Sequence, residues 1–318
     1  MLKKAGLVLL LLILLLLLLP ALIVKSCGGK TLPDAKGDPY QVTVWNHKTQ
    51  ELMRLPLGEY LAGVVAAEMP ASFDLEALKA QAIVARTYTV AKIRAAGGAG
   101  CSAHPEADIC TNSAHCQAWV SKEEATGNWP FFRQRSYWRK ILRAVAETES
   151  QVVTYEGKMI DAVYHSTCGG STENCEDVWT NPLPYLRSVQ CGYCASSPRY
   201  TETLSLGAAQ VAEKLGVPPE ELKLTVLEST PGGRIIKVST GKETLRGLEF
   251  RQKLGLRSAK VTWLMGKDGY SFTSVGYGHG VGLCQYGADG MARQGYLAED
   301  IIKKYYTGVV VSRVKLGE

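Results

Sequence analysis

The sequence reads Leu57-Gly-Glu-Tyr-Leu-Ala-Gly-Val-Val-Ala-Ala-Glu68 and then, beyond Met69-Pro70, Leu75-Glu-Ala-Leu-Lys-Ala-Gln-Ala-Ile-Val-Ala-Arg-Thr-Tyr88. Both parts carry apolar residues at the spacing of an α-helix, which predicts two helices packed in the core. Pro70 ends the first helix because it lacks a backbone N–H donor. Ser72 or Asp74 begins the second, since both residue types are favourable N-caps. We expect the rest of the chain to pack around this helix pair.

Glu68 stands at the end of the first helix, in a position where a carboxylate is costly. It continues the apolar series of Leu57, Leu61 and Val64, so it lies on the face that the helix is expected to bury. Burial penalises the ionised form and raises the pKa, which suits a general acid working near neutral pH. On spacing alone, two other interpretations stay open: the side chain turns into solvent at a frayed helix end, or it pairs with Arg86.

The composition describes an ordinary globular protein. The chain has 318 residues, a formal net charge of +6 and 46% hydrophobic residues, which is ample for a large core. The basic residues are scattered rather than gathered in a stripe, and no nucleic-acid-binding motif is present. Composition therefore favours neither nucleic acid nor any other particular partner.

The N-terminus has the pattern of a membrane anchor. Lys3 and Lys4 precede a run of uncharged, mostly leucine residues from 7 to 24. At about 1.5 Å per residue, such a helix is just long enough to cross a hydrocarbon core of about 30 Å. The lysines are expected to stay inside, so the rest is exported. The predicted organisation is a cytoplasmic tail (1–6), a transmembrane signal anchor (7–24), a flexible Gly- and Pro-containing linker (25–39) and an extracytoplasmic domain (40–318).

The remaining patterns predict an α+β fold, with one mixed domain of hairpins around the central helix pair. Alternating segments separated by turn residues read as hairpins, and longer periodic segments read as helices. The predicted hairpins cover residues 40–55, 151–164 and 222–239, and further strands are expected at 259–264, 270–275 and 309–314. The predicted helices cover residues 136–149, 206–215, 244–254, 285–293 and 297–306.

A group of soft ligand residues lies between the second helix and residue 120. His104, Cys110, His115 and Cys116 form a full tetrahedral set of nitrogen and sulfur ligands for zinc. Their spacing is not that of a common zinc finger. In an exported domain, a disulfide between Cys110 and Cys116, or between Cys101 and Cys116, explains the cysteines equally well.

Two further cysteine segments are less distinctive. His165, Cys168 and Cys175 offer three candidate ligands without a fourth nearby in the sequence, which favours a disulfide or a plain loop. Cys191-Gly-Tyr-Cys194 is a single C-x-x-C with no second copy, so we expect a local disulfide or free thiols there. Residues 276–282 form a glycine-rich loop around His279, where the backbone can approach a ligand closely.

Three of these segments resemble the signatures of one known family. Val64–Pro70 and Leu78–Tyr88 resemble the first signature of the stage II sporulation protein D family, and Gly278–Ala288 resembles the second. The resemblance covers the chain from about Tyr40 to the C-terminus. Members of that family are lytic transglycosylases, which cleave peptidoglycan glycan strands during engulfment of the developing spore. Some relatives are described instead as enhancers of a cell-wall amidase.

The resemblance assigns roles to individual residues. Glu68 matches the catalytic acid and base. Clostridial members carry a zinc site with a His-x5-Cys-x4-His-Cys arrangement, which His104, Cys110, His115 and Cys116 match, and four protein ligands indicate a structural ion near the cleft. No organic cofactor is implied. The residues expected to contact sugar are Arg86, Tyr185, Arg187, His279, Gln285 and Tyr286. The chain departs from the family at Cys168 and Cys175, and at Cys284, where serine is usual.

The implied reaction opens the β-1,4 linkage of denuded strands between N-acetylmuramic acid and N-acetylglucosamine, leaving a 1,6-anhydro end. The implied location is the mother-cell membrane facing the forespore, with the domain outside the cytoplasm. Implied partners are the amidase called stage II sporulation protein P and stage II sporulation protein M. Two alternatives stay open: a non-catalytic, glycan-binding enhancer of an amidase, and a zinc amidase whose metal performs the chemistry.

Overall fold

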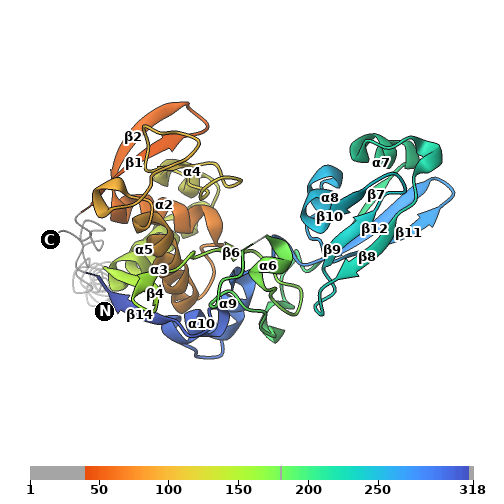
Figure 1. Ribbon diagram of the computed structural model, residues 1–318. Helices are drawn as coiled ribbons and strands as arrows, with labels where there is room; N and C mark the ends of the chain where they lie inside the picture. Colours follow the sequence, from red (N-terminus) through yellow and green to blue (C-terminus); the bar gives the residue numbers. More distant parts are fainter. Residues whose placement is uncertain (1–39, 180, 315–318) are drawn as a thin grey trace, which may run out of the picture. The chain divides into compact units, whose positions relative to one another are not determined.

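The computed structural model describes residues 40–179 and 181–314. The tail, membrane anchor and linker predicted for residues 1–39 lie outside the described residues. Of the helices within the described ranges, none has the length and hydropathy of a membrane span. The described chain is a mixed arrangement of helices and small sheets, so the α+β prediction is confirmed for this part (Figure 1).

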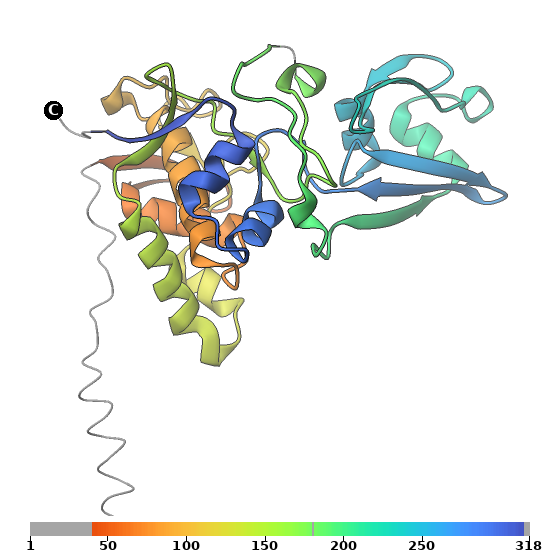
Figure 2. The ribbon, with the colours of Figure 1, turned by 90° about the horizontal axis from the view of Figure 1, so that it is seen from below.

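The predicted helix pair is present as α2 (Leu57–Glu68) and α3 (Leu75–Val90). The Asp74 carboxylate caps α3 by accepting the backbone N–H of Glu76 at 3.0 Å. The small residues Ala77, Ala80, Ala82 and Ala85 of α3 are all fully buried, which lets neighbouring helices approach closely. Helix α3 also packs against α5 (Phe131–Glu147), α9 (Gln285–Ala292) and α10 (Ala298–Tyr305). Helices α9 and α10 are drawn in blue in Figure 2.

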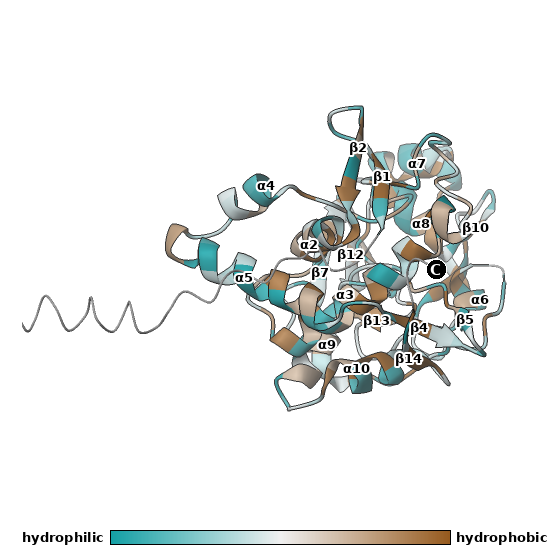
Figure 3. Cartoon of the chain, turned by 90° about the vertical axis from the view of Figure 1, so that its left-hand side faces the viewer, coloured by the Kyte–Doolittle hydropathy of each residue, from teal (hydrophilic) through white to brown (hydrophobic). Residues whose placement is uncertain are grey.

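Helix α5 begins five residues earlier than the predicted segment and follows a short helix, α4 (Lys122–Gly127), that was not predicted. Hydrophilic and hydrophobic residues are interspersed along α5 (Figure 3). Its apolar side, with Trp138, Ile141 and Val145, is buried, while Phe131 and Phe132 at its start are exposed. The periodic centre of the helix was therefore recognisable, whereas its exposed first turn was not.

Gly63 lets α2 approach the segment after Cys116. A β-carbon at Gly63 would lie 2.2 Å from Trp119 Nε1 and 2.6 Å from the carbonyl oxygen of Val120. The Val120 N–H in turn bonds to the Gly63 carbonyl at 3.4 Å. This contact fixes the segment that leads from the cysteine-rich loop to α4.

Replacing Gly63 by alanine should therefore destabilise the fold. Intrinsic helix propensity alone would stabilise α2 by about 1 kcal/mol, but overpacking against Trp119 and Val120 is expected to cost about 1–3 kcal/mol. The matched control is Gly127→Ala at the end of α4, where a β-carbon meets nothing within 4 Å. Urea denaturation of both variants measures the difference, and a Gly63→Ala chain as stable as Gly127→Ala would refute the overpacking.

The strands of the described residues form five small sheets. In the first, β1 (Gln41–Asn46) pairs antiparallel with β2 (Glu51–Pro56) and parallel with β3 (Ile109–Cys110). In the second, β4 (Gln151–Tyr155) pairs with β5 (Lys158–Met159) and with β14 (Val310–Arg313). The third consists of β6 (Tyr164–His165) and β13 (Leu283–Cys284), which are parallel. This last pair brings the second signature segment beside the loop that begins at His165.

Residues 201–275 contribute the other two sheets and a hydrophobic cluster of their own. One sheet has β7 (Thr201–Leu206), β12 (Gly269–Val275) and β11 (Val261–Gly266); the other has β8 (Thr225–Ser229), β9 (Ile235–Ser239) and β10 (Thr244–Arg246). Two helices, α7 (Ala208–Leu215) and α8 (Gly247–Leu254), accompany them. The predicted helix 244–254 is wrong in its first turn, because residues 244–246 pair with β9, and strand β7 was not predicted.

Short helical turns complete the described chain. They are η2 (Arg94–Ala96), α6 (Cys175–Val178), η3 (Gly192–Cys194) and η4 (Pro219–Glu221).

Candidate functional site

An open cleft of about 600 Å³ lies at the C-terminal end of α2. Residues from well-separated parts of the sequence line it. They are Ala66, Ala67, Glu68, Met69, Pro70, Ser113, Trp129, Tyr164, His165, Ser166, Arg199, Tyr277, Gly278, His279, Gln285 and Tyr286. Glu68 is the one carboxylate among the described residues of this lining. The cleft therefore contains one acid and several aromatic and imidazole side chains.

Glu68 is held in the cleft by the break in the helix. Pro70 follows it almost at once, and the α2 helix ends at Met69, whose N–H bonds to the Val65 carbonyl at 3.0 Å. The Glu68 Oε1 atom accepts the backbone N–H of Ala118 at 3.0 Å. Burial raises the pKa of Glu68, although the bond from Ala118 and side-chain bonds from Tyr164 and Gln285 act in the opposite direction. The carboxyl thus keeps its proton to higher pH than an exposed glutamate.

Two hydrogen-bonding side chains position that carboxyl. The Tyr164 hydroxyl accepts Gln117 Nε2 at 3.1 Å, which leaves its proton for Glu68. Burial raises the pKa of Tyr164 well above its ordinary value, so it remains a neutral donor. Gln285 is buried and donates from Nε2 to the Gln81 side-chain oxygen at 3.3 Å. Glu68 is therefore positioned from β6, from the start of α9 and, through Gln81, from α3.

His279 lies in the cleft with both ring nitrogens engaged. Its Nδ1 accepts the Val281 N–H at 3.1 Å, so its Nε2 is the protonated nitrogen that donates to the Tyr164 carbonyl at 2.8 Å. Burial lowers the pKa of His279 to about 4. Near neutral pH the ring is therefore neutral and fixed in one tautomer, which fits a positioning role better than proton transfer.

His165 is the second imidazole of the cleft, 5.5 Å from His279 between ring centroids. Its Nδ1 donates to the Val281 carbonyl at 3.1 Å, while its buried Nε2 has no hydrogen-bond partner among the described residues. Burial lowers the pKa of His165 well below its ordinary value. His165 lines the cleft and belongs to neither group of metal-ligating residues found among the described residues.

Three of the residues expected to contact sugar lie elsewhere. Arg86 is fully buried in α3 and donates to the Val145 carbonyl at 3.1 Å, because its helix face packs on α5. Tyr185 uses its hydroxyl to accept the Asp161 N–H at 3.1 Å. Arg187 forms a two-point ion pair with Glu176, one arm of which measures 2.6 Å. None of the three lines the cleft, whereas His279, Gln285 and Tyr286 do.

Other cleft residues were not foreseen. Tyr277 lies inside the glycine-rich loop, and that sequence feature could have identified it as a cleft residue. Arg199 is the one arginine or lysine among the described residues of the lining, and its guanidinium stacks over the Tyr277 ring at 5.2 Å. Trp129 comes from the turn before α5. Nothing in the local sequence around Arg199 or Trp129 marks them, because they reach the cleft only through the tertiary fold.

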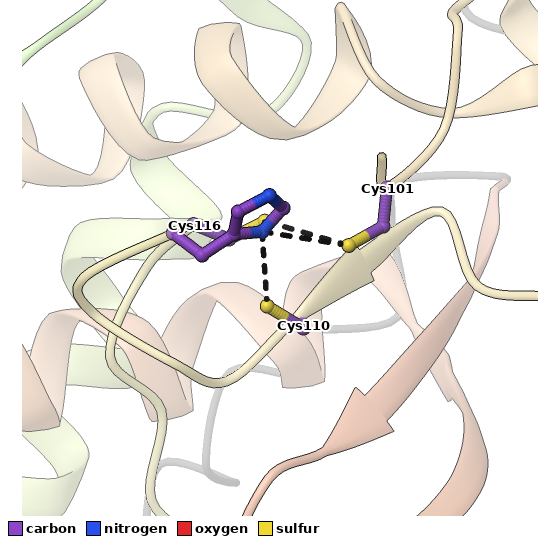
Figure 4. Close-up of side chains that lie close together, drawn as sticks. Cys101, Cys110 and Cys116 are labelled. Carbon is purple, nitrogen blue, oxygen red and sulfur yellow. Dashed lines mark hydrogen bonds between the residues drawn. The ribbon is translucent and has the colours of Figure 1, made fainter. Parts of the chain in front are cut away.

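A group of four soft ligands, here called the cysteine–histidine group, lies beside the cleft: Cys101, Cys110, His115 and Cys116. Their ligand atoms all lie within 4.8 Å of one another. Figure 4 shows the three sulfur atoms turned toward one imidazole, and the His115 Nδ1 atom lies 3.6, 3.5 and 3.3 Å from the sulfurs of Cys101, Cys110 and Cys116. Three thiols and an imidazole converging in this way fit a tetrahedral zinc ion.

The cysteine–histidine group differs from the predicted ligand set in one member. His104 lies outside it, stacked on the Trp45 ring at 4.8 Å and paired with Glu106 at 3.8 Å. Cys101 takes its place: it is buried, and its backbone N–H donates to the Ala107 carbonyl at 3.0 Å. His115 and Cys116 also line a second hollow, of about 280 Å³, that shares Glu68 with the cleft.

Comparison with known proteins shows the family to which the chain is related. Residues 45–155, which include Glu68 and the cysteine–histidine group, match the family described as stage II sporulation protein. Stage II sporulation protein D of Bacillus subtilis (strain 168) is 38% identical over 289 residues, covering 90% of this chain and 82% of that protein. The protein of the same name from Bacillus amyloliquefaciens is 38% identical over 282 residues, covering 88% and 81%.

A more distant relative carries a different name. The protein called amidase enhancer from Bacillus subtilis (strain 168) is 26% identical over 308 residues, covering 79% of this chain and 40% of the relative. The two signature segments quoted from the sequence meet at one cleft, and the similarity to the Bacillus proteins extends over most of both chains. This chain therefore belongs to the stage II sporulation protein D family, a family of sporulation proteins.

Proposed function

We propose that this protein is a peptidoglycan lytic transglycosylase in which Glu68 serves first as acid and then as base. The observation that carries the proposal is a single carboxyl with a raised pKa in an open, aromatic-lined cleft. Hydrolytic glycosidases normally use two carboxylates. Among the described residues of this lining there is one, which supports a reaction that does not need a second carboxylate to activate water.

The proposed reaction balances without water. Protonated Glu68 donates its proton to the glycosidic oxygen as the bond from C1 of N-acetylmuramic acid breaks, releasing the 4-hydroxyl of N-acetylglucosamine. The Glu68 carboxylate then takes the proton of the muramic C6 hydroxyl, and O6 forms the new bond to C1. Tyr164, Gln285 and the Ala118 N–H stabilise the carboxylate stage, because all three donate to Glu68.

The cleft also suits a strand without stem peptides. Removal of a stem peptide leaves the lactyl carboxylate of muramic acid free and negatively charged. Arg199 offers a cation in the cleft, held in place by stacking on Tyr277. This arrangement supports the preference for denuded strands, supplied by an amidase that acts first.

The cysteine–histidine group would hold a zinc ion through Cys101, Cys110, His115 and Cys116. Four protein ligands leave no open position, so the ion would stabilise the loop that carries the Ala118 donor. We further propose that residues 7–24 anchor the protein in the mother-cell membrane, with stage II sporulation proteins P and M as partners.

A second function, a glycan-binding enhancer of an amidase, is favoured by the similarity to the amidase enhancer. The experiment that separates the two is digestion of denuded and of peptide-bearing glycan strands by the purified chain without amidase. Mass spectrometry should find 1,6-anhydro ends from the denuded strands. An absence of new ends, together with retained strand binding, would support the enhancer instead.

The pH dependence of this reaction should report the protonation state of Glu68. The acid must carry its proton, and burial raises its pKa above that of a free glutamate. The rate should therefore hold from acidic pH up toward that raised pKa and fall as pH rises through it. His279, with its pKa lowered to about 4, should not contribute a limb near neutrality. A rate that instead rises with pH across this window would contradict a protonated Glu68 as the acid.

A further inference from the structure

A second group of soft ligands lies in the protein, distinct from the cysteine–histidine group. Cys168, Cys191, Cys194 and Cys284, here called the four-cysteine group, are all buried, and their sulfur atoms lie within 4.8 Å of one another. They come from the loop after β6, from both ends of η3 and from the residue before α9. From the sequence, we expected a disulfide or a plain loop at Cys168 and Cys175, and a local disulfide or free thiols at Cys191 and Cys194. The structure leaves Cys175 outside the group and brings Cys284 into it.

We propose that the four-cysteine group is a structural zinc site. Zinc holds four thiolates at about 2.3 Å in a tetrahedron, which places the sulfur atoms about 3.8 Å apart. The 3.4 Å between the Cys168 and Cys194 sulfurs and the 4.8 Å limit for the whole group lie around that value. The Cys191-Gly-Tyr-Cys194 segment has the C-x-x-C spacing of zinc ribbons, with Cys168 and Cys284 completing the set.

The surroundings of the sulfurs suit thiolates. The Cys284 sulfur accepts the backbone N–H groups of Cys168 and of Gly287, both at 3.3 Å. The Tyr305 hydroxyl lies 3.1 Å from the Cys191 sulfur. Donors of this kind stabilise metal-bound thiolates and orient them, as in the outer shell of known metal sites. A β-carbon at Gly287 would lie 2.0 Å from the Tyr305 hydroxyl, so this glycine is needed for the approach.

Two cations lie close to the four-cysteine group, and one of them, Arg234, also pairs with Glu173 at 3.3 Å. A tetrathiolate zinc carries a net charge of about −2 in a buried position, which requires neighbouring cations. Arg234 donates to the Cys168 carbonyl at 3.2 Å, and Lys260 donates to the Gly169 carbonyl at 2.9 Å. Both cations therefore contact the loop that carries the first ligand.

Zinc binding at this site would hold residues that line the cleft in place. Cys168 follows His165 and Ser166 closely, and Cys284 immediately precedes Gln285 and Tyr286. One ion would therefore tie the β6 loop to the start of α9, which carries the Gln285 donor to Glu68. The proposal does not depend on the reaction proposed above, because its test measures metal content.

The test is elemental analysis of the full chain, purified in detergent without chelator, with its Cys→Ser variants. Wild type is expected to hold about two zinc ions, one per ligand group. Cys284→Ser and Cys110→Ser should each lose about one. Cys175→Ser is the control, since Cys175 is buried but outside both groups and its sulfur accepts the Leu183 N–H at 3.0 Å. A zinc content unchanged by Cys284→Ser would overturn the proposal.

A second measurement tests the proposal even if Cys284→Ser fails to fold. In the Cys110→Ser chain, which keeps the four-cysteine group intact, X-ray absorption at the zinc edge should show a shell of four sulfurs at about 2.3 Å. Non-reducing alkylation and peptide mapping of the wild type should find all four thiols free once the metal is removed by acid. Disulfide-linked peptides containing Cys168, Cys191, Cys194 or Cys284, or iron in place of zinc, would overturn the assignment.

Discussion

Replacing Glu68 by glutamine should lower the rate of glycan cleavage by about 10²- to 10⁴-fold, the usual contribution of a general acid and base. Glutamine keeps the size of the side chain and can still occupy the space beside Ala118, but it can neither donate the proton to the glycosidic oxygen nor take one from the C6 hydroxyl. Binding of denuded strands should change far less, because Arg199, Tyr277 and His279 remain in the cleft. The measurement is the rate of appearance of 1,6-anhydro ends by mass spectrometry.

Two comparisons make the result specific. Glu59→Gln changes an exposed side chain in the otherwise buried first turn of α2 and should keep the wild-type rate. Burial raises the Glu68 pKa, so the folded state binds this proton more tightly than the unfolded state, and stability falls as pH rises above the unfolded value toward the folded one. Glu68→Gln removes that loss of stability, so at neutral pH the variant should unfold at a urea concentration no lower than wild type. Wild-type cleavage by Glu68→Gln would remove Glu68 from the mechanism.

Replacing Arg234 by methionine should destabilise the fold by about 3–5 kcal/mol, because it leaves a buried carboxylate without its partner. Arg234 Nε lies 3.3 Å from Glu173 Oε1, and both side chains are only 2% exposed. Burial raises the pKa of Glu173 and lowers that of Arg234, which is the direction of a pair dominated by desolvation. Arg234 also donates to the carbonyls of Gly278 and Cys168, at 3.1 and 3.2 Å, so its loss frees two acceptors as well.

The double variant Glu173→Gln/Arg234→Met separates charge from packing. It removes both ions together, and we expect it to be more stable than Arg234→Met alone. Arg246→Met serves as the surface control, since Arg246 is exposed while its guanidinium donates to the Val178 and Trp179 carbonyls. Urea denaturation of wild type and the three variants gives the free energies of unfolding. A double variant no more stable than Arg234→Met would show that the loss comes from packing alone.

The helix pair and its glutamate could be predicted because both depend on local pattern. The apolar spacing of α2 and the proline after Glu68 indicated a carboxyl at a helix end on the inward face, while the same pattern left open a solvent-facing side chain or a pair with Arg86. The family resemblance implied a sugar contact for Arg86, whereas its long side chain is accommodated inside the core between α3 and α5. A helical pattern identifies the inward face but not which inward residue reaches a cleft.

The rest of the site depends on contacts between distant segments. Tyr164 and Gln285 meet at Glu68 only because the two-residue strands β6 and β13 pair. The cysteines show the same limit: His104 and Cys101 are close in the sequence, and only the turn between them decides which one faces Cys110. The four-cysteine group was missed for the same reason, since Cys168 and Cys284 lie 116 residues apart.

The pairing of Tyr164 with Leu283 has a consequence for the order in which the chain is made. Glu68, Ala118 and Tyr164 leave the ribosome well before Gln285, the third donor to the Glu68 carboxyl, which arrives only with α9. A nascent or truncated polypeptide that stops before residue 283 contains Glu68 but lacks strand β13 and the Gln285 side chain. Under the proposed function, such a shortened polypeptide is expected to cleave glycan strands far more slowly than a chain that includes α9.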